Sequence, residues 1–198
     1  MGFSRTQTGT NADTDTGMDT DRKHTGRRLA ALAAAAAIAA AGTVCARADD
    51  WAFGVRAGHD IDQVRLDLVE IFVARRLPWT YRFASGAEAR TSAELAAGTL
   101  RAAGTRGYLG RLGGTLAYHT PGGRWVFEVG TSIAGLSESR FGDYDLGGQV
   151  QFVSHLGLRL HLGEAFALGY RVQHLSNAGL DTPNPGLDSQ ALELRYRF

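Results

Sequence analysis

Apolar and polar residues alternate with a period of two along most of the chain from residue 49 onward, and the last segment is the clearest case. Between Leu192 and Phe198, four apolar residues alternate with three charged ones. Successive side chains of a β-strand point to opposite faces, so this strand has one apolar face and one charged face. The period predicts a strand rather than a helix.

The same alternation recurs in segments about as long as a membrane-spanning strand, about 9 to 11 residues. Further strands are expected at residues 166–172, 150–162, 125–133, 112–118, 79–97, 64–68 and 51–57, of which 79–97 is the least regular. Together these make eight, the smallest even-numbered outer-membrane barrel, whose interior is filled by side chains. The predicted fold is therefore all-β, an eight-stranded antiparallel transmembrane β-barrel of the bacterial outer membrane over residues 49–198.

The connections between the predicted strands support this topology. Thr120–Gly123 and Gly163–Glu164 are tight turns, whereas longer connections are expected near residues 99–108, 138–146 and 177–187. Short turns of such barrels face the periplasm and long loops face outward. A soluble eight-stranded barrel of lipocalin type is the structural alternative. Charged residues at the inward-facing positions of the strands disfavour a lipocalin barrel, because the interior of a lipocalin is apolar.

Residues 1–48 are expected to be an N-terminal extension followed by a cleaved signal peptide. Residues 29–46 carry no charge, follow Arg27 and Arg28, and end at the small-x-small pattern Ala46–Ala48. A transmembrane helix is the rival interpretation, but an alanine-rich segment inserts poorly. Met18 is an alternative start, and Cys45 follows Val44 rather than the small residue expected of a lipoprotein. Export and the barrel together predict an integral outer-membrane protein.

The composition and net charge of residues 49–198 differ from those of the whole chain. The whole chain of 198 residues has a net charge of +1 and a mean hydropathy of −0.16, values typical of a soluble domain. Residues 49–198 contain 15 arginines, 16 acidic residues, no lysine and no cysteine, for a formal charge of −1. No nucleic-acid partner is indicated. We expect the inward-facing charges to pair in the barrel interior, and they include Arg65, Asp67, Arg111, Glu128, Arg171, Glu193, Arg195 and Arg197.

Three polar residues occupy strand positions whose side chains should face lipid. The apolar face of the seventh strand continues into His174 and Ser176, and that of the eighth runs back to Asp188. With both termini periplasmic, all three lie near the outer rim. Same-face neighbours on a strand are about 6.6 Å apart. A serine hydroxyl needs a base, and the base needs an orienting partner, so Ser176, His174 and Asp188 are the ingredients of an activated nucleophile. Polar residues that meet lipid headgroups at the strand ends are the alternative interpretation.

The loop at 177–186 supplies candidate oxyanion donors, namely Asn184, the backbone of Gly179, and Asn177. His59, His119, His155 and His161 can be interpreted as metal ligands, but hydrogen bonding in a filled interior explains them better. No metal and no cofactor are expected.

The run from His174 to Asp188 resembles the active-site segment of the lipid A 3-O-deacylase family, PagL. It carries His-x-Ser-Asn-Ala-Gly-Leu followed by Pro-Asn-x-Gly, and the similarity extends upstream over Phe127–Gly135. The resemblance implies an eight-stranded outer-membrane barrel with Ser176 as nucleophile, His174 as general base and Asp188 as acid. The family pattern has glutamate at the acid position, so the shorter Asp188 must approach His174 more closely. Asp181 is an alternative orienter, which its position in the loop disfavours.

The resemblance implies a serine esterase that removes the acyl chain from the 3-position of lipid A, with lipopolysaccharide of the outer leaflet as its partner. A non-catalytic small barrel, for adhesion or envelope stability, is the alternative, and an acyltransferase or phospholipase on a similar barrel is a third. The terminal Phe198 resembles the signal that the outer-membrane assembly machinery recognises. The resemblance also allows a homodimer.

Overall fold

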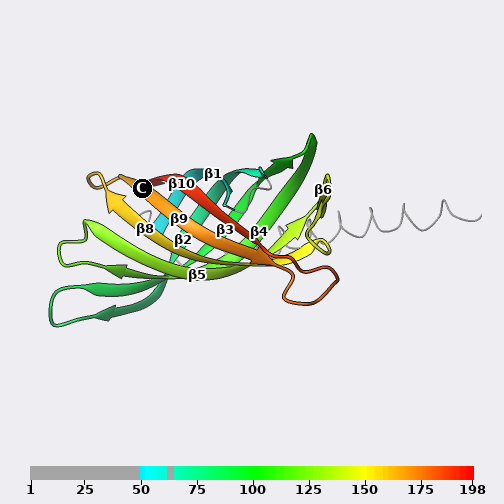
Figure 1. Cartoon of the computed structure of the whole chain (residues 1–198). Coiled ribbons are helices and arrows are strands. Elements are labelled where there is room, and N and C mark those ends of the chain that lie inside the picture. The colour runs from blue at the N-terminus through cyan, green and yellow to red at the C-terminus, as the bar shows by residue number, and fades with distance from the viewer. Residues whose placement is uncertain (1–49, 62–64) are drawn as a thin grey trace, which may run out of the picture.

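The computed structural model describes residues 50–61 and 65–198, so the extension and signal peptide expected at 1–48 lie outside the described residues. This part of the chain forms ten strands: β1 Trp51–Asp60, β2 Asp67–Arg82, β3 Glu88–Ala102, β4 Thr105–His119, β5 Trp125–Leu136, β6 Arg140–Phe141, β7 Tyr144–Asp145, β8 Val150–His161, β9 Phe166–Ser176 and β10 Leu187–Arg197. All but β6 and β7 close into one barrel in the order β1-β10-β9-β8-β5-β4-β3-β2 (Figure 1). The eight-stranded fold is confirmed.

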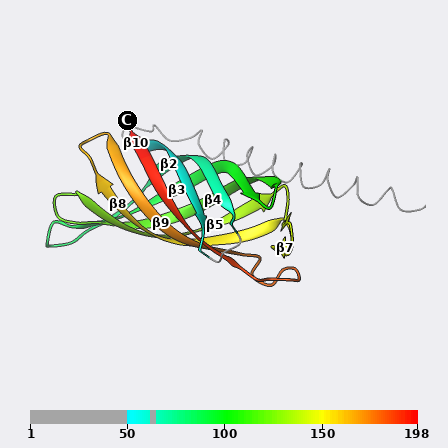
Figure 2. The same ribbon diagram turned by 45° about the horizontal axis from the view of Figure 1, so that its top comes forward.

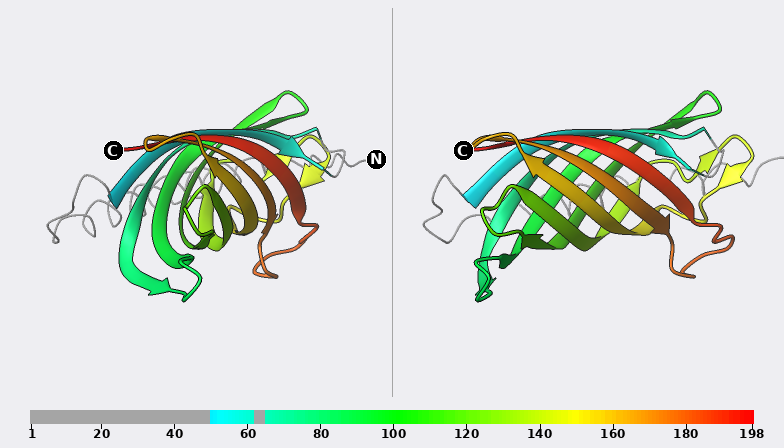
Figure 3. Two further views of the ribbon diagram at one scale, coloured as in Figure 1. Left: turned by 90° about the vertical axis from the view of Figure 1, so that its left-hand side faces the viewer. Right: turned by 60° about the vertical axis from the view of Figure 1, so that its left-hand side comes forward.

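Neighbouring barrel strands are antiparallel throughout, and they cross the barrel at an incline (Figures 2 and 3). The carboxy-terminus lies at one end, whereas β6, β7 and the loop at 177–186 lie at the other (Figure 1). The carboxy-terminal end also holds the turns at 83–87, 120–124 and 162–165. Since short turns face the periplasm, the β6–β7 end is the extracellular one.

Two expectations about the first half of the barrel were wrong. The strand expected at 79–97 is in fact the end of β2, a turn, and the start of β3. The register shifts between Arg76 and Thr80, where adjacent arginines and Pro78 interrupt the alternation. The connection at 99–108 is not long, because Ala103 and Gly104 turn the chain with φ values of 48° and 77°. Two successive positive φ values suit a tight hairpin. An alanine at the first of these positions is not a sequence signal for such a turn.

The outer surface of the barrel is apolar. Leu192 is 69% exposed and Ile71 64%, and the outward residues of β9 and β10 keep the predicted parity, with Phe166, Leu168, Tyr170, Leu194, Tyr196 and Phe198 all exposed. A broad apolar exterior over charged interior side chains is the arrangement of an outer-membrane barrel. Among the described residues, no helix is long and apolar enough to cross a membrane.

An ionic network fills the middle of the barrel. Arg56 is wholly buried and lies 2.7 Å from Glu70, 3.1 Å from Glu94 and 2.8 Å from Glu193. Arg111, Arg171 and Arg195 pair with the same carboxylates. Paired charges satisfy one another where water is excluded. The expected pairing holds for these residues. Asp67 is instead exposed, because the inward residues of β2 are the even-numbered ones, and Arg65, which precedes β2, is exposed as well.

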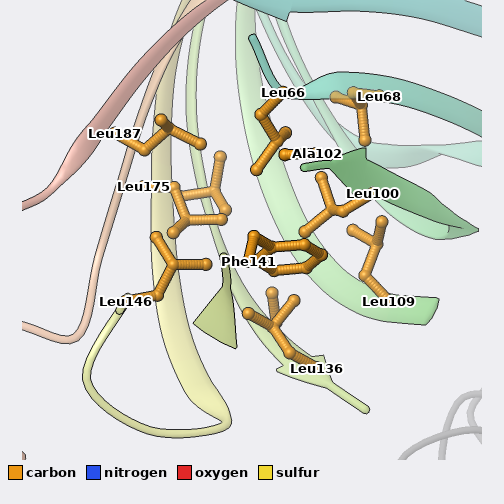
Figure 4. Packing of buried hydrophobic residues seen from close by; sticks show 12 residues of the cluster. Leu66, Leu68, Leu100, Ala102, Leu109, Leu136, Phe141, Leu146, Leu175 and Leu187 are labelled. Atoms are coloured by element: carbon orange, nitrogen blue, oxygen red, sulfur yellow. The ribbon is translucent and has the colours of Figure 1, made fainter. Parts of the chain in front are cut away.

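Above this network, the extracellular end of the interior is apolar. Buried leucines from several strands pack around Phe141 of β6 and around Leu146, the residue that follows β7 (Figure 4). Leu175 of β9 and Leu187 of β10 belong to the same cluster. Because the two leucines point inward, their neighbours along each strand must point out toward lipid. The cluster therefore anchors the outer ends of β9 and β10, which carry the predicted site.

Candidate active site

His174 and Asp188 face each other across the β9–β10 ladder. They are register partners, and His174 Nδ1 lies 2.6 Å from Asp188 Oδ1. The two side chains are 50% and 56% exposed on the outer face of the barrel. The aspartate therefore reaches the ring in spite of its short side chain. A carboxylate on Nδ1 fixes the tautomer and leaves Nε2 as the nitrogen that can accept a proton.

Ser176 is the last residue of β9 and shares the outer face with His174. It is half-buried, whereas Leu175 and Asn177 on either side are buried. The strand therefore sets Ser176 on the same outer face as His174 and Asp188, as the alternation predicts.

A second serine lies beside the histidine. Ser154 of β8 is the register partner of His174 on the side opposite Asp188, and it is exposed on the same outer face. Ser154 is not among the site residues predicted from the sequence. The alternation in β8 does indicate its position, because Ser154 lies on the same face as the exposed Phe152 and Leu156.

The ring of His174 leans over Gly186. A Cβ atom at Gly186 would lie 2.8 Å from His174 Cε1 and 3.4 Å from Nε2. Leu187 is the register partner of Leu175. Because the two strands are antiparallel, continuing this register by one residue places Gly186 opposite Ser176. The ring is thus directed toward the serine end of the strand. The Tyr144 hydroxyl of β7 donates to the Gly186 carbonyl oxygen, which ties this glycine to the β6–β7 hairpin.

Asn177 holds the loop at 177–186 together. Its side chain is fully buried, and Nδ2 donates to the carbonyl oxygens of Gly147, Asp181 and Pro183 at 2.6, 3.0 and 2.9 Å. Its Oδ1 accepts the N–H of Gly179 at 2.8 Å. These contacts commit the Asn177 amide and the Gly179 N–H inside the loop, so in this conformation neither is available to an oxyanion.

Asn184 differs from the other two candidates for the oxyanion site. It is exposed, and its Oδ1 accepts the backbone N–H of Asn177 at 3.1 Å. This contact holds the oxygen of the Asn184 amide beside the backbone of the residue that follows Ser176, and Nδ2 is the donor of the same amide.

Asp181 does not take the place of Asp188. Its Oδ1 accepts the N–H of Thr182 at 2.8 Å, and its carbonyl oxygen accepts from Asn177, so its contacts lie within the loop. No group of three or more His, Cys, Asp or Glu residues in the described ranges is arranged to hold a metal ion.

The fold and this cluster define a small barrel of outer-membrane type that carries a serine, a histidine and a carboxylate on its lipid-facing surface. The model of the family described as lipid A 3-O-deacylase (PagL) matches residues 72–197. The chain belongs to this family.

Individual relatives agree with this assignment. Over 77 residues the chain is 39% identical to a lipid A deacylase PagL of Bordetella bronchiseptica, a match over 39% of this chain and 43% of that protein. Over 65 residues it is 38% identical to the Pseudomonas aeruginosa lipid A deacylase PagL, covering 33% and 38% of the two chains. The matches thus span less than half of either relative.

Two solved structures share the fold. The crystal structure of the outer membrane enzyme PagL superposes with a TM-score of 0.68 at 20% identity, covering 74% of this chain and 99% of that one. The N-terminal β-barrel domain of Pseudomonas aeruginosa OprF gives a TM-score of 0.50 at 15% identity, covering 76% and 98%. At these identities the similarity concerns the barrel architecture.

Proposed function

We propose that this protein is a lipid A 3-O-deacylase, a serine esterase that hydrolyses the ester-linked acyl chain at the 3-position of lipid A in the outer membrane. The observation that carries the proposal is the His174–Asp188 contact of 2.6 Å on the outer face, two residues from Ser176. Membership of the lipid A 3-O-deacylase family supports the choice of substrate.

Ser176 is the proposed nucleophile. His174 Nε2 takes the proton from the Ser176 hydroxyl as Oγ attacks the ester carbonyl carbon, and Asp188 stabilises the imidazolium that forms. The bond between the carbonyl carbon and the 3-oxygen of the sugar then breaks, and His174 returns its proton to that oxygen. Water then attacks the carbonyl carbon of the acyl-serine while His174 takes a proton from the water. The bond from that carbon to Ser176 Oγ breaks, His174 returns the proton to Oγ, and the fatty acid is released. We assign the donor to the oxyanion to Asn184 Nδ2, because Asn177 and Gly179 have their donors committed in the loop.

The position of the site suits a substrate that never leaves the membrane. His174 and Asp188 are about half exposed on the lipid-facing surface, at the extracellular end of strands β9 and β10. The esters of lipid A lie at the boundary between headgroups and acyl chains in the outer leaflet. Lateral diffusion can bring an ester to this site without extraction of an acyl chain, which would expose it to water.

Ser154 provides the matched control for the nucleophile. Both serines lie on the outer face beside His174, but the ring leans toward Gly186, at the Ser176 end. With purified protein in detergent micelles, Ser176→Ala should abolish release of the 3-linked hydroxy fatty acid from lipid A, whereas Ser154→Ala should retain it. Loss of release in Ser154→Ala with full activity in Ser176→Ala would reverse the assignment.

A further inference from the structure

A second polar cluster lies inside the barrel at the periplasmic end, away from the proposed active site. A cavity of about 110 Å³ is present there. Alanines such as Ala74 and Ala117 line it, and their small side chains leave space where longer ones would fill the interior. Small inward residues at the mouth of a filled barrel create room for a ligand.

The charges around this cavity are unbalanced. Five arginines line it against a single carboxylate, that of Asp50, and the arginines are Arg76, Arg90, Arg159, Arg195 and Arg197. Three of them have carboxylate partners close by, since Arg90 lies 2.7 Å from Glu88, Arg195 lies 3.0 Å from Glu193 and Arg159 lies 2.9 Å from Glu128. The excess positive charge therefore belongs to the other two, Arg76 and Arg197.

Both of these arginines contact neutral acceptors. Arg76 Nη2 donates to the Thr80 hydroxyl at 3.2 Å, and Arg197 Nη2 donates to the carbonyl oxygen of Glu164 at 2.6 Å. A neutral acceptor orients a guanidinium without cancelling its charge. Both groups thus keep a positive charge at the mouth of the cavity.

Arg159 supplies the strongest indication of a ligand. The residue is only 5% exposed. Its Nη2 lies 2.9 Å from Glu128, but Nε and Nη1 are buried and have no hydrogen-bond partner among the described residues. Buried charged donors are nearly always satisfied in native proteins, and an exception marks a position that an ion or ligand can fill.

We infer that this periplasmic cavity binds a phosphate group. The planar forks of Arg76 and Arg197 match the oxygens of a phosphate better than a point charge would, and Arg159, whose Nε and Nη1 have no hydrogen-bond partner among the described residues, belongs to the lining of the same cavity. The volume suits one phosphate and its neighbouring atoms rather than a whole lipid. Inorganic phosphate and the headgroup of a phospholipid from the periplasmic leaflet share this chemistry.

The experiment measures binding to the purified full-length mature barrel in a phosphate-free maltoside detergent, by calorimetry at low salt. The probes are inorganic phosphate and a short-chain phosphatidylglycerol. The test variant is Arg76→Gln/Arg197→Gln, which leaves the buried network intact. Its matched control is Arg106→Gln, which removes an exposed arginine from β4 at the opposite end of the barrel.

The wild type should bind at least one probe, with a Kd that rises at least tenfold in the double variant and less than twofold in Arg106→Gln. Binding of inorganic phosphate supports the free ion as ligand, and binding of the phosphatidylglycerol alone supports the lipid headgroup. The inference is overturned if neither probe binds, or if the double variant binds as the control does. Lipid A deacylation by the double variant should equal the wild type, which keeps this test separate from that of the proposed function.

Discussion

Gly186 is the position where one added methyl group should test the geometry of the proposed base. In Gly186→Ala, the new Cβ would lie 2.8 Å from His174 Cε1, whereas ordinary contact begins at 3.4 Å. The backbone of Gly186 is held by Tyr144 and by the start of β10. The imidazole, which is half exposed, is the part that can move.

The required shift of the ring is about 0.6 Å, and a misplacement of about 1 Å in a catalytic group can reduce the rate about 100-fold. We therefore expect kcat to fall about 10- to 100-fold, equivalent to about 1.4 to 2.7 kcal/mol of transition-state stabilisation. KM should change little, because the ring is not expected to carry ground-state binding of the lipid.

Backbone strain must be separated from this contact. Gly186 has a φ of 72°, and an alanine in the left-handed region costs about 1–2 kcal/mol. Gly104→Ala carries the same strain, because Gly104 has a φ of 77° and nothing lies within 4 Å of its added Cβ. Both variants should lose similar stability in a heat-modifiable gel assay. Equal kcat values for the two variants in a lipid A deacylation assay would refute the proposed steering of His174 by Gly186.

Three other predictions concern the acid, the hairpin and the buried network. Asp188→Asn should lower kcat about 10²- to 10⁴-fold by removing the charge that orients His174, while Asp188→Glu should keep most activity; equal activity of the two variants would exclude a role for the carboxylate. Tyr144→Phe removes the hydrogen bond to Gly186 and should lower kcat by less than Gly186→Ala in the same assay. Glu94→Gln should destabilise the barrel by about 3–5 kcal/mol in urea titrations, because it leaves buried arginines short of a partner. The control Glu88→Gln, on the same strand but in the exposed pair with Arg82, should cost about 0–1 kcal/mol, and similar losses in the two would contradict the network.

The alternation of residues predicts the barrel and the placement of the site because both depend on local parity. His174, Ser176 and Asp188 share a face for the same reason that Leu192 and Leu194 do. What parity does not supply is which side chains meet across strands. Glu70 and Glu94 are separated from Arg56 by 14 and 38 residues, and only the closed barrel brings them together.

The loop shows a similar limit. Asn177, Gly179 and Asn184 are all plausible donors in the sequence, yet the structure buries the Asn177 side chain as the centre of the loop. Its role depends on Gly147, 30 residues away, which no local pattern reveals. The recognition of Phe198 by the assembly machinery, and association into a homodimer, stay predictions.

Mass spectrometry of lipid A from cells that express the wild-type chain, Ser176→Ala or no barrel decides whether this protein removes the 3-linked acyl chain through Ser176. We expect that lipid A from wild-type cells loses one 3-linked hydroxyacyl group, and that lipid A from Ser176→Ala cells matches the lipid A of cells without the barrel. Unchanged lipid A in cells with folded wild-type barrel, or the same loss with folded Ser176→Ala, would contradict it.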